Sequence, residues 1–458
     1  MALKFGTSGL RGLVTDMSPE VIERYTTAFL TGCKGIEVLC VGRDLRASSP
    51  RIAGDVMRAA AQIGCNVIDC GAVPTPALAL AAVARGAGAV MVTGSHIPAD
   101  RNGLKFYTQA GEITKDDEKN ILASFETARV SVGAATGVTS VDENVAEIYI
   151  DRYVNAFGDQ ALAGKRIGVY SHSAVGRDIL HKVLTRLGAE VVECGRSDIF
   201  IPVDTEAVDP DTRTKIKNWV QTENLDALVS TDGDSDRPLL ADENGQIVPG
   251  DVMGQITAQY LEAETVVTPI SSNSGVTQKG FDSVTRTKIG SPFVIAGMNE
   301  AGGRVVGYEA NGGFLLGYEA DGPEGPLPPL STRDAVLPLI AVLSAAGSLP
   351  LSARVSSEPA VFTAADRLQE VEQSRTRPFM QKLAEQSDVR GAFLKPLGGE
   401  EAHCDLTDGV RMSLRDGRVV HVRPSGNAPE LRLYIEAETS DAANELLADG
   451  LHQLQHML

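Results

Sequence analysis

The chain of 458 residues carries 42 basic and 60 acidic side chains, which gives a formal net charge of −18 at pH 7. This charge argues against binding to nucleic acid or to an anionic membrane surface, although local arginines can still bind a small anion. Hydrophobic residues make up 43% of the chain and charged residues 22%, as is typical of a globular protein with a sizeable core. At roughly 100–200 residues per domain, we expect about three or four domains.

The six cysteines predict neither a metal site nor a redox site. They form no CxxC pair and stand apart from any histidine cluster, so we expect buried, reduced thiols. The stretch MALKFGTSGLRG lacks the basic and apolar regions of a signal peptide. No apolar run reaches the roughly 20 residues that a membrane span needs. The sequence therefore predicts a cytoplasmic protein.

A unit of strand, polar turn, helix, strand and glycine occurs three times. It covers residues 36–71, residues 165–195 and, in degenerate form, residues 265–290. In the second copy, Ile179, Val183, Leu184 and Leu187 fall on one face of the expected helix. Strands that alternate with helices indicate mostly parallel βαβ units.

Each copy is followed by one more apolar strand that ends in a polar loop containing glycine. These segments read GAVMVTGSH, LDALVSTDGDSDR and GRVVGYEANGG. Ligands of open α/β sheets bind beyond the carboxyl ends of the strands. If the three related domains converge, these loops line one cleft.

The last part of the chain, from about Ser356, shows no fourth copy. Residues 409–438 alternate in polarity around an Asp-Gly pair, which predicts an antiparallel hairpin, and helices are expected over residues 377–386 and 442–457. The predicted fold class is α/β, with three related mixed α/β domains and a smaller α+β fourth domain that has an antiparallel sheet. The predicted domains are residues 1–142, 143–244, 245–354 and 355–458.

The motif DGDSDR places Asp232, Asp234 and Asp236 directly after an apolar strand. Three carboxylates so close together repel one another unless a cation is present, and hard oxygen ligands suit Mg²⁺. An acidic surface turn is the alternative interpretation. An EF-hand is disfavoured, because no glutamate stands at loop position twelve and no helix precedes the loop.

The motif RPSGNAPELR combines a guanidinium, a hydroxyl and successive backbone N–H groups. Arg423, Ser425, Gly426 and Asn427 together predict a phosphate-binding loop, with a plain glycine turn as the alternative.

Four weaker candidates accompany these two motifs. Ser95 lies in the first strand-end loop, with Lys105 ten residues further on. The stretch GTSGLRG offers Ser8 and Arg11, or is simply a flexible turn, and TKIGSP offers Lys288 and Ser291 as anion contacts. Glu309 in GYEANGG is either an acceptor for sugar hydroxyls or a surface acid. The whole set favours phosphoryl transfer to and from a sugar phosphate.

Four motifs, TGSHIP, DGDSDR, GYEANGG and RPSGNAP, resemble in order the signature loops of the α-D-phosphohexomutase family. The resemblance covers the whole chain. It implies four domains around a central cleft, the first three related, and an isomerase that acts as an intramolecular phosphotransferase. It also implies that Ser95 carries a phosphate, with a hexose 1,6-bisphosphate as intermediate and activator.

The resemblance also implies a role for each motif residue. Mg²⁺ would be held by Asp232, Asp234, Asp236 and an oxygen of phosphorylated Ser95. Arg11 and Lys105 would serve the reacting phosphate and proton transfer, and Arg237 would face the cleft. The sugar and the phosphate that is not reacting would be bound by Glu309, Asn311, Gly312, Lys288, Ser291, Arg423, Ser425, Gly426 and Asn427.

The chain departs from the family pattern in two loops. Many members have Ser-Gly-His where this chain has Asn311-Gly312-Gly313, so a histidine often assigned to proton transfer is absent. Lys105 or His96 must then do more, or the base lies elsewhere; His96 is alternatively a structural group that orients its loop. The serine loop has His-Ile-Pro in place of the usual His-Asn-Pro, which removes a turn-stabilising side chain.

The substrate expectation follows from the sugar loop. Its Glu-Ala-Asn-Gly-Gly form resembles bacterial phosphomannomutases, including those that act on glucose phosphates, although RPSG is shared with phosphoglucosamine mutases. We predict interconversion of mannose 1-phosphate and mannose 6-phosphate, with phosphoglucomutase or phosphoglucosamine mutase activity as alternatives. Rival hypotheses are a Mg²⁺-dependent sugar-phosphate phosphatase and a catalytically inactive binding protein. The expected partners are small hexose phosphates, with no nucleic acid and no membrane.

Overall fold

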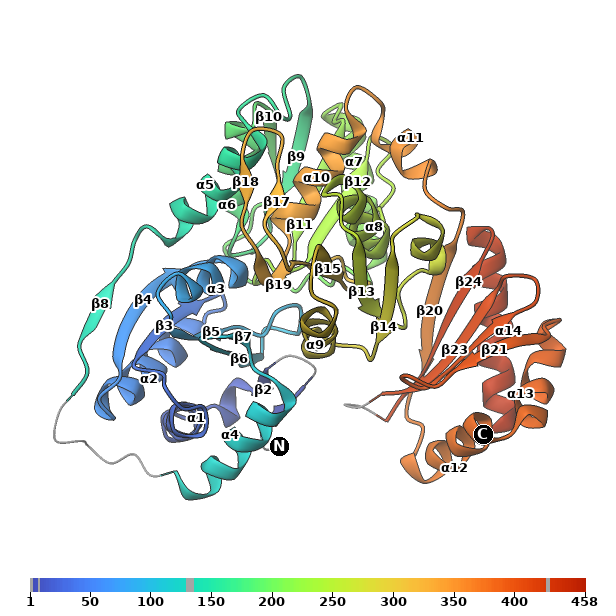
Figure 1. Cartoon of the computed structure of the whole chain (residues 1–458), viewed down its shortest axis with the longest axis horizontal. Coiled ribbons are helices and arrows are strands. Elements are labelled where there is room, and N and C mark those ends of the chain that lie inside the picture. The colour runs from blue at the N-terminus through green and yellow to red at the C-terminus, as the bar shows by residue number, and fades with distance from the viewer. Residues whose placement is uncertain (1–2, 7–8, 129–135, 426–428) are drawn as a thin grey trace. The chain divides into compact units, whose positions relative to one another are not determined.

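The computed structural model describes residues 3–6, 9–128, 136–425 and 429–458 (Figure 1). The chain divides into two compact units: Met1–Val266 with Gly290–Val355, and Val267–Ile289 with Ser356–Leu458. The division falls within β13 (Thr265–Pro269) and within α11 (Leu351–Ser356).

The first unit begins with a mixed sheet in the strand order β1-β2-β6-β5-β3-β4-β8, with β7 beside β6. Pairs β3–β4, β3–β5 and β4–β8 are parallel, and β5–β6 and β2–β6 are antiparallel. The strands are β1 (Lys4–Phe5), β2 (Leu10–Leu13), β3 (Val38–Arg43), β4 (Asn66–Ala72), β5 (Gly88–Val92), β6 (Arg101–Thr108), β7 (Gly111–Glu112) and β8 (Thr139–Val141).

Four α-helices belong to this sheet: α1 (Pro19–Gly32), α2 (Ser49–Gln62), α3 (Thr75–Val83) and α4 (Lys115–Thr127). Local sequence explains where α4 begins, because Thr114 and Asp117 form a reciprocal capping box. All five residues of β5 are buried, which explains its unbroken apolar sequence Gly-Ala-Val-Met-Val.

A second sheet of the first unit has the order β10-β9-β11-β12, with β9 parallel to β10 and β11 and with β12 antiparallel. Its elements are α5 (Val145–Phe157), β9 (Arg166–Tyr170), α6 (Arg177–Arg186), β10 (Glu190–Cys194), α7 (Pro210–Thr222), β11 (Ala227–Thr231) and β12 (Pro238–Asp242). The predicted strand–helix–strand units over residues 36–71 and 165–195 are confirmed by β3-α2-β4 and β9-α6-β10.

Before and after the third repeat, residues 265–290, the first unit contains α8 (Gly250–Tyr260), α9 (Ser291–Ala301) and α10 (Val336–Ala346). The antiparallel strands β15 (Val305–Tyr308), β16 (Phe314–Leu316) and β19 (Leu330–Asp334) follow that repeat in the chain. Strands β17 (Ala320–Asp321) and β18 (Pro326–Leu327) form a separate hairpin. Between β13 and β14 (Ser283–Thr287) the structure has only a short 3₁₀ helix over Ser274–Gln278, so this copy is indeed degenerate.

The second unit contains a five-stranded antiparallel sheet in the order β20-β24-β23-β22-β21. The hairpin of β22 and β23 turns at Gly417, whose φ of 90° suits glycine, as the Asp-Gly pair predicts. The elements are β20 (Phe362–Leu368), α12 (Gln373–Glu385), α13 (Ser387–Leu394), β21 (Glu401–Asp405), β22 (Val410–Leu414), β23 (Val419–Pro424), β24 (Leu431–Ala437) and α14 (Ser440–Met457).

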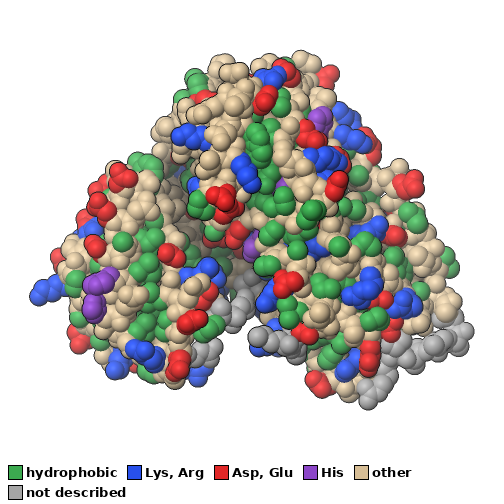
Figure 2. Space-filling view, turned by 180° about the vertical axis from the view of Figure 1, so that it is seen from behind, with side chains coloured by type: hydrophobic (Ala, Val, Ile, Leu, Met, Phe, Trp, Pro, Cys, Tyr) green, Lys and Arg blue, Asp and Glu red, His purple; other side chains and the backbone are tan. Residues whose placement is uncertain are grey.

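The surface carries charges of both signs, and the thiols are mostly buried. Acidic and basic side chains are intermixed on the face drawn in Figure 2. No helix within the described ranges has both the length and the apolar character to cross a membrane. The six cysteines form no disulfide, and all except Cys404 are buried, as expected.

Candidate active site

Ser95 lies in the loop that follows β5 and is buried, with a φ of 54°. Few residues other than glycine adopt this left-handed conformation, so the surrounding loop must hold it in place. The Ser95 N–H donates to Thr93 Oγ1 at 2.8 Å, and the Ser95 hydroxyl donates to Asp232 Oδ2 at 2.5 Å. The serine oxygen is therefore fixed against the loop that carries the three aspartates.

Arg46 is the main support of the serine loop. Its guanidinium donates to four backbone carbonyls, at 2.8 Å to Ser95, 2.6 Å to Ile97, 2.7 Å to Pro98 and 3.0 Å to Arg101. Arg46 was not among the residues predicted from the sequence. The signal was present in GRDLRASSP, where a charged loop follows a buried strand at the same sheet edge as Ser95.

Asp44 completes this support beneath Arg46. The Asp44 carboxylate accepts from Arg46 Nε at 3.2 Å, Ser49 Oγ at 2.5 Å and Thr93 Oγ1 at 2.7 Å. Thr93 in turn accepts from the Ser95 N–H, so Asp44 acts on the serine through its neighbours. Burial raises the pKa of Asp44, although these hydrogen bonds and Arg46 oppose the shift.

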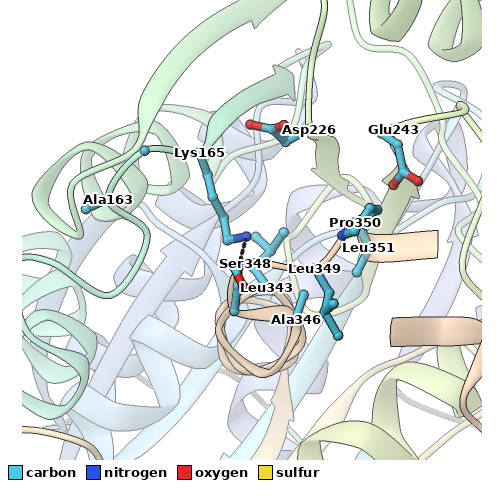
Figure 3. A pocket seen from close by; sticks show the side chains of 12 residues that line it. Ala163, Lys165, Asp226, Glu243, Leu343, Ala346, Ser348, Leu349, Pro350 and Leu351 are labelled. Carbon is cyan, nitrogen blue, oxygen red and sulfur yellow. Dashed lines mark hydrogen bonds between the residues drawn. The ribbon is translucent and has the colours of Figure 1, made fainter. Parts of the chain in front are cut away.

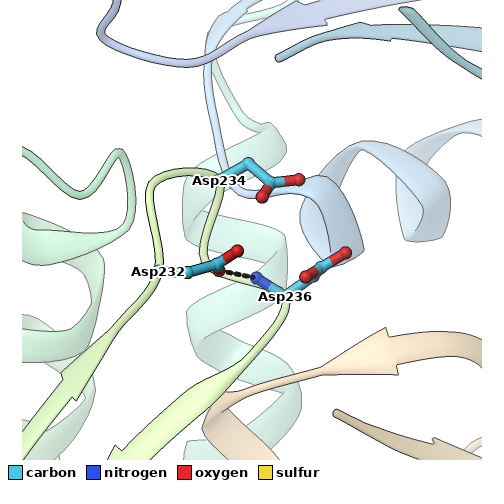
Figure 4. Close-up of side chains that lie close together, drawn as sticks. All are labelled: Asp232, Asp234 and Asp236. Atoms are coloured by element: carbon cyan, nitrogen blue, oxygen red, sulfur yellow. Dashed lines mark hydrogen bonds between the residues drawn. The ribbon is translucent and has the colours of Figure 1, made fainter. Parts of the chain in front are cut away.

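Asp232, Asp234 and Asp236 follow β11 and are all buried (Figure 4). One carboxylate oxygen from each lies within 4.8 Å of the other two. The Asp236 N–H donates to Asp232 Oδ1 at 3.2 Å, which closes the loop on itself. A side chain at Gly233 would bring its Cβ to 2.7 Å from the Ser95 carbonyl oxygen, so glycine allows the two loops to lie together.

This set of donors fits a hard divalent cation. Asp234 Oδ1 and Asp236 Oδ1 are buried without a hydrogen-bond partner among the described residues. Burying a carboxylate oxygen without a partner is costly, and a metal ion would supply that partner. The three aspartates can therefore hold the predicted metal, although the chemistry of the donors does not single out magnesium.

The carboxylates do not titrate alike. Burial, together with Asp234 and Asp236, raises the pKa of Asp232 well above its ordinary value. Burial also acts to raise the pKa of Asp236, but Arg333, Lys105 and Arg237 outweigh it and hold that pKa below its ordinary value. Cations gathered around Asp236 thus keep it ionised.

Lys105 on β6 is buried and lies between two of the aspartates. Its Nζ donates to Asp234 Oδ2 at 2.6 Å and also to Asp236 Oδ2. Arg11 on β2 is within electrostatic range of the same carboxylates, and burial and neighbouring Arg237 lower its pKa to about 10. The structure thus brings Lys105 and Arg11 to the aspartate loop.

His96 contacts both Ser95 and Arg237. Its Nδ1 lies 3.2 Å from Ser95 Oγ and 3.1 Å from Arg237 Nη1. Because a guanidinium can only donate, Nδ1 must accept, which leaves the ring neutral with its proton on Nε2. Burial and Arg237 lower the pKa of His96 to about 2, which favours a loop-orienting role over proton transfer.

Glu309 follows β15 and is buried. Gly312, with a φ of 85°, donates its N–H to the Glu309 carbonyl at 2.9 Å, and Asn311 Oδ1 accepts from the Gly313 N–H at 3.0 Å. The Asn311 side chain therefore shapes the loop. Glu309 Oε2 accepts from Arg333 Nη1 at 3.1 Å, and Arg333 was also missed by our sequence analysis.

Ser291 begins α9 and is buried. Its hydroxyl lies 2.8 and 2.9 Å from the two carboxylate oxygens of Glu112 and accepts from Arg333 Nη1 at 3.1 Å. In this structure the predicted anion contact is therefore part of an internal network that includes Glu112.

The remaining predicted binding residues belong to the second unit or lie outside the described ranges. Lys288 follows β14 and is exposed. Arg423 pairs with Asp408 through Nε and Oδ2 at 2.9 Å, and the Ser425 N–H donates to the Glu430 carbonyl at 2.9 Å. Gly426, Asn427 and Ser8 fall outside the described residues.

A cavity of about 330 Å³ in the first unit does not coincide with these groups (Figure 3). It is lined mainly by the end of α10, the following loop and residues 163–165. Its polar groups bond to the chain itself, since Lys165 Nζ donates to the Gly347 carbonyl at 2.7 Å and the Ser352 N–H donates to Glu243 at 3.1 Å. None of the predicted site residues lines it.

Known protein families and relatives match the chain along most of its length. Four phosphoglucomutase/phosphomannomutase domains match in order: domain I over residues 2–131, domain II over 147–245, domain III over 249–362 and the C-terminal domain over 368–452. A phosphomannomutase of Sinorhizobium fredii is 45% identical, covering 98% of both chains. The chain belongs to the phosphoglucomutase/phosphomannomutase family.

Two further similarities agree with this assignment. A phosphomannomutase of Salmonella muenchen is 41% identical, covering 100% of this chain and 96% of its own. The crystal structure of a phosphoglucomutase/phosphomannomutase family protein from Burkholderia thailandensis has a TM-score of 0.79 at 20% identity, over 98% of this chain and 97% of that one, which supports the fold. The predicted family, fold class and phosphohexomutase enzyme are confirmed. The domain boundaries and the individual site residues stay predictions.

Proposed function

We propose that this family member is a phosphomannomutase that interconverts mannose 1-phosphate and mannose 6-phosphate through a phosphoserine at position 95. The relatives that are 45% and 41% identical over nearly the whole chain carry that name. The single observation that carries the proposal is the buried Ser95 hydroxyl, which donates to Asp232 Oδ2 at 2.5 Å beside two further aspartates. A serine that carries a phosphoryl group needs such a site for a cation next to its oxygen.

Magnesium, when bound by Asp232, Asp234, Asp236 and an oxygen of the phosphorylated serine, would neutralise charge on the transferring phosphoryl group. The chain's own residues prepare that chemistry. Arg333, Lys105 and Arg237 keep Asp236 ionised, and the Arg46 hydrogen bonds hold the serine loop in its left-handed conformation. Arg11 is proposed to contact the reacting phosphate.

In the first half of the reaction a sugar hydroxyl attacks the phosphorus carried by Ser95. The bond from phosphorus to Ser95 Oγ breaks as the bond to the sugar oxygen forms, and the product is a hexose 1,6-bisphosphate. We propose that Lys105 supplies the proton that Ser95 Oγ takes up and regains the proton that the attacking sugar hydroxyl releases, because Lys105 is buried and held at the aspartate loop.

In the second half the bisphosphate turns around and returns its other phosphate to Ser95. Glu309 is proposed to accept hydroxyl groups of the sugar in both orientations. Lys288, Arg423, Ser425, Gly426 and Asn427 are proposed to hold the phosphate that is not reacting. Added hexose 1,6-bisphosphate would therefore act as an activator, since it phosphorylates Ser95.

Mannose phosphates are the proposed substrates and glucose phosphates a second group, with phosphoglucosamine mutase activity as the alternative. No observation here favours a phosphatase. A cytoplasmic location and the lack of nucleic-acid and membrane partners stay predictions from the sequence.

A coupled assay tests the proposal. Mannose, glucose and glucosamine 1-phosphates are supplied in turn with Mg²⁺ and the matching 1,6-bisphosphate. We expect the highest rate with mannose 1-phosphate, no activity in Ser95→Ala, and full activity in the control Ser283→Ala, which changes an exposed serine. Equal rates with all three sugars would contradict the substrate, and release of free phosphate at the rate of turnover would indicate a phosphatase.

A further inference from the structure

The side chain of Arg333 fills the space beside Gly313. A Cβ added at Gly313 would lie 2.6 Å from Arg333 Cδ, 2.8 Å from Cγ and 3.0 Å from Cβ. These atoms belong to the stem of the side chain, which cannot move aside without carrying the guanidinium with it. Gly313 stands where many family members have the sugar-loop histidine, so such a side chain and Arg333 in this position exclude one another.

Arg333 connects the sugar loop to the aspartate loop. The residue lies on β19 and is 2% exposed. Its Nε and Nη2 donate to Asp236 Oδ2 at 3.1 and 2.8 Å, and its Nη1 donates to Glu309 Oε2 at 3.1 Å. One rigid fork thus holds a proposed metal ligand and the proposed sugar-binding acid at a fixed separation.

This arrangement assigns each carboxylate oxygen a separate task. Arg333 and Lys105 both donate to Asp236 Oδ2. Asp236 Oδ1 has no hydrogen-bond partner among the residues described, and Arg237 Nε lies 3.7 Å from it. Arg333 likewise donates to Glu309 Oε2, which fixes the orientation of that carboxylate.

We propose that Arg333 is a positioning residue that orients Glu309 toward the sugar and Asp236 toward the metal, in the space that the absent sugar-loop histidine leaves open. Because a guanidinium stays protonated, Arg333 occupies the space of that histidine but does not transfer protons as the histidine would. The inference rests on the proposed function, because it assigns sugar binding to Glu309.

A double-mutant cycle of Arg333→Lys and Glu309→Gln tests the inference. Lysine keeps the charge but loses the fork that bonds two carboxylates at once. We expect each single variant to raise the KM for mannose 1-phosphate about tenfold or more, the loss of roughly one charged hydrogen bond. Because Arg333 acts on the sugar through Glu309, we expect the double variant to match Glu309→Gln. An unchanged KM in Arg333→Lys, or effects that multiply, would overturn the inference.

Gly313→Ala tests the same contact without removing a charge. The backbone at Gly313 is outside the left-handed region, and the three atoms nearest to an added Cβ all belong to Arg333, so the methyl group displaces that side chain. We expect the KM to rise as in Arg333→Lys. The matched control is Gly391→Ala, where a Cβ meets no atom within 4 Å, and it should behave as wild type. Wild-type kinetics in Gly313→Ala would count against the inference even if Arg333→Lys fails to fold.

Failure of the proposed function would look different. The wild-type protein would then convert none of the three hexose 1-phosphates. The urea-unfolding midpoints of the wild type, the two single variants and the double variant measure the coupling between Glu309 and Arg333 without any substrate. Shifts that are not additive would support the link, and additive shifts would overturn it.

Discussion

Arg46→Met removes the support of the serine loop while keeping an apolar stem of similar length. Four backbone carbonyls, including that of Ser95, lose their donor. The buried Asp44 carboxylate also loses its ion-pair partner, which lies 3.2 Å away. The hydroxyls of Ser49 and Thr93 remain as partners of Asp44, but neither carries a charge.

The expected loss of stability follows from burial. Both partners of the ion pair are at most 1% exposed in their side chains. Removing one partner of a buried pair costs about 3–5 kcal/mol, so we expect the free energy of unfolding to fall by about 4 kcal/mol. That is a large share of the roughly 5–15 kcal/mol typical of folded proteins. Arg46→Lys keeps the charge without the fork and should lose about 2 kcal/mol.

Urea denaturation of the full chain, followed by intrinsic fluorescence and circular dichroism, measures the loss. The matched control is Arg58→Met, since Arg58 is half-exposed and pairs with the partly exposed Glu23. Its other partner, Asp55, is buried but keeps Arg51 Nη1 at 2.9 Å when Arg58 is replaced. Such a pair is worth about 1 kcal/mol or less. The reasoning is refuted if Arg46→Met and Arg58→Met lose the same stability, or if Arg46→Met retains wild-type stability.

Three further predictions concern other parts of the chain. Gly233→Ala forces its Cβ against the Ser95 carbonyl, so kcat should fall at least tenfold. The control Gly54→Ala lies on helix α2, where the added Cβ meets no atom within 4 Å, and it should keep full activity. Equal kcat values for the two variants would contradict the packing of the two loops. Lys105→Met should lower kcat by roughly 100-fold or more while phosphorylation of Ser95 by the bisphosphate stays detectable in mass spectra, and an unchanged kcat would remove Lys105 from proton transfer. Burial lowers the pKa of His421 from 6.5 to about 4, so as pH falls the unfolded chain takes up a proton before the folded protein does. The stability that neutral His421 contributes is complete above pH 6.5 and is lost as pH falls toward 4, by about 3 kcal/mol at most. His421→Gln should therefore flatten this part of the curve of unfolding free energy against pH, measured by urea denaturation.

Hydrophobic patterning and strand-end loops predicted the fold and the position of the site. The two clear repeats begin with short apolar strands, and their helices show a 3.6-residue period, so both signals are local. The loops after β5, β11 and β15 carry Ser95, the aspartates and Glu309, and the structure brings all three loops into the first unit. The third copy was harder to recognise in the sequence, because no helical period of apolar residues occurs between β13 and β14.

Arg333 and Arg46 could not be recognised in the same way. A single arginine in a strand such as Leu-Ser-Thr-Arg-Asp is typical of a solvated surface. The role of Arg333 depends on Asp236 and Glu309, 97 and 24 residues away along the chain, and only tertiary packing brings these groups together. The left-handed conformation of Ser95 is likewise imposed by hydrogen bonds from distant segments, because serine alone does not favour it.

The central claim is that Ser95 carries the phosphoryl group. Intact-protein mass spectrometry, before and after incubation with mannose 1,6-bisphosphate and Mg²⁺, tests it most directly, with peptide mapping to locate the modification. We expect one added phosphoryl group on the peptide that contains Ser95, its transfer to added mannose 1-phosphate, and no modification in Ser95→Ala. A protein that is never phosphorylated yet turns over, or a phosphoryl group on Asp232 in place of Ser95, would contradict the account.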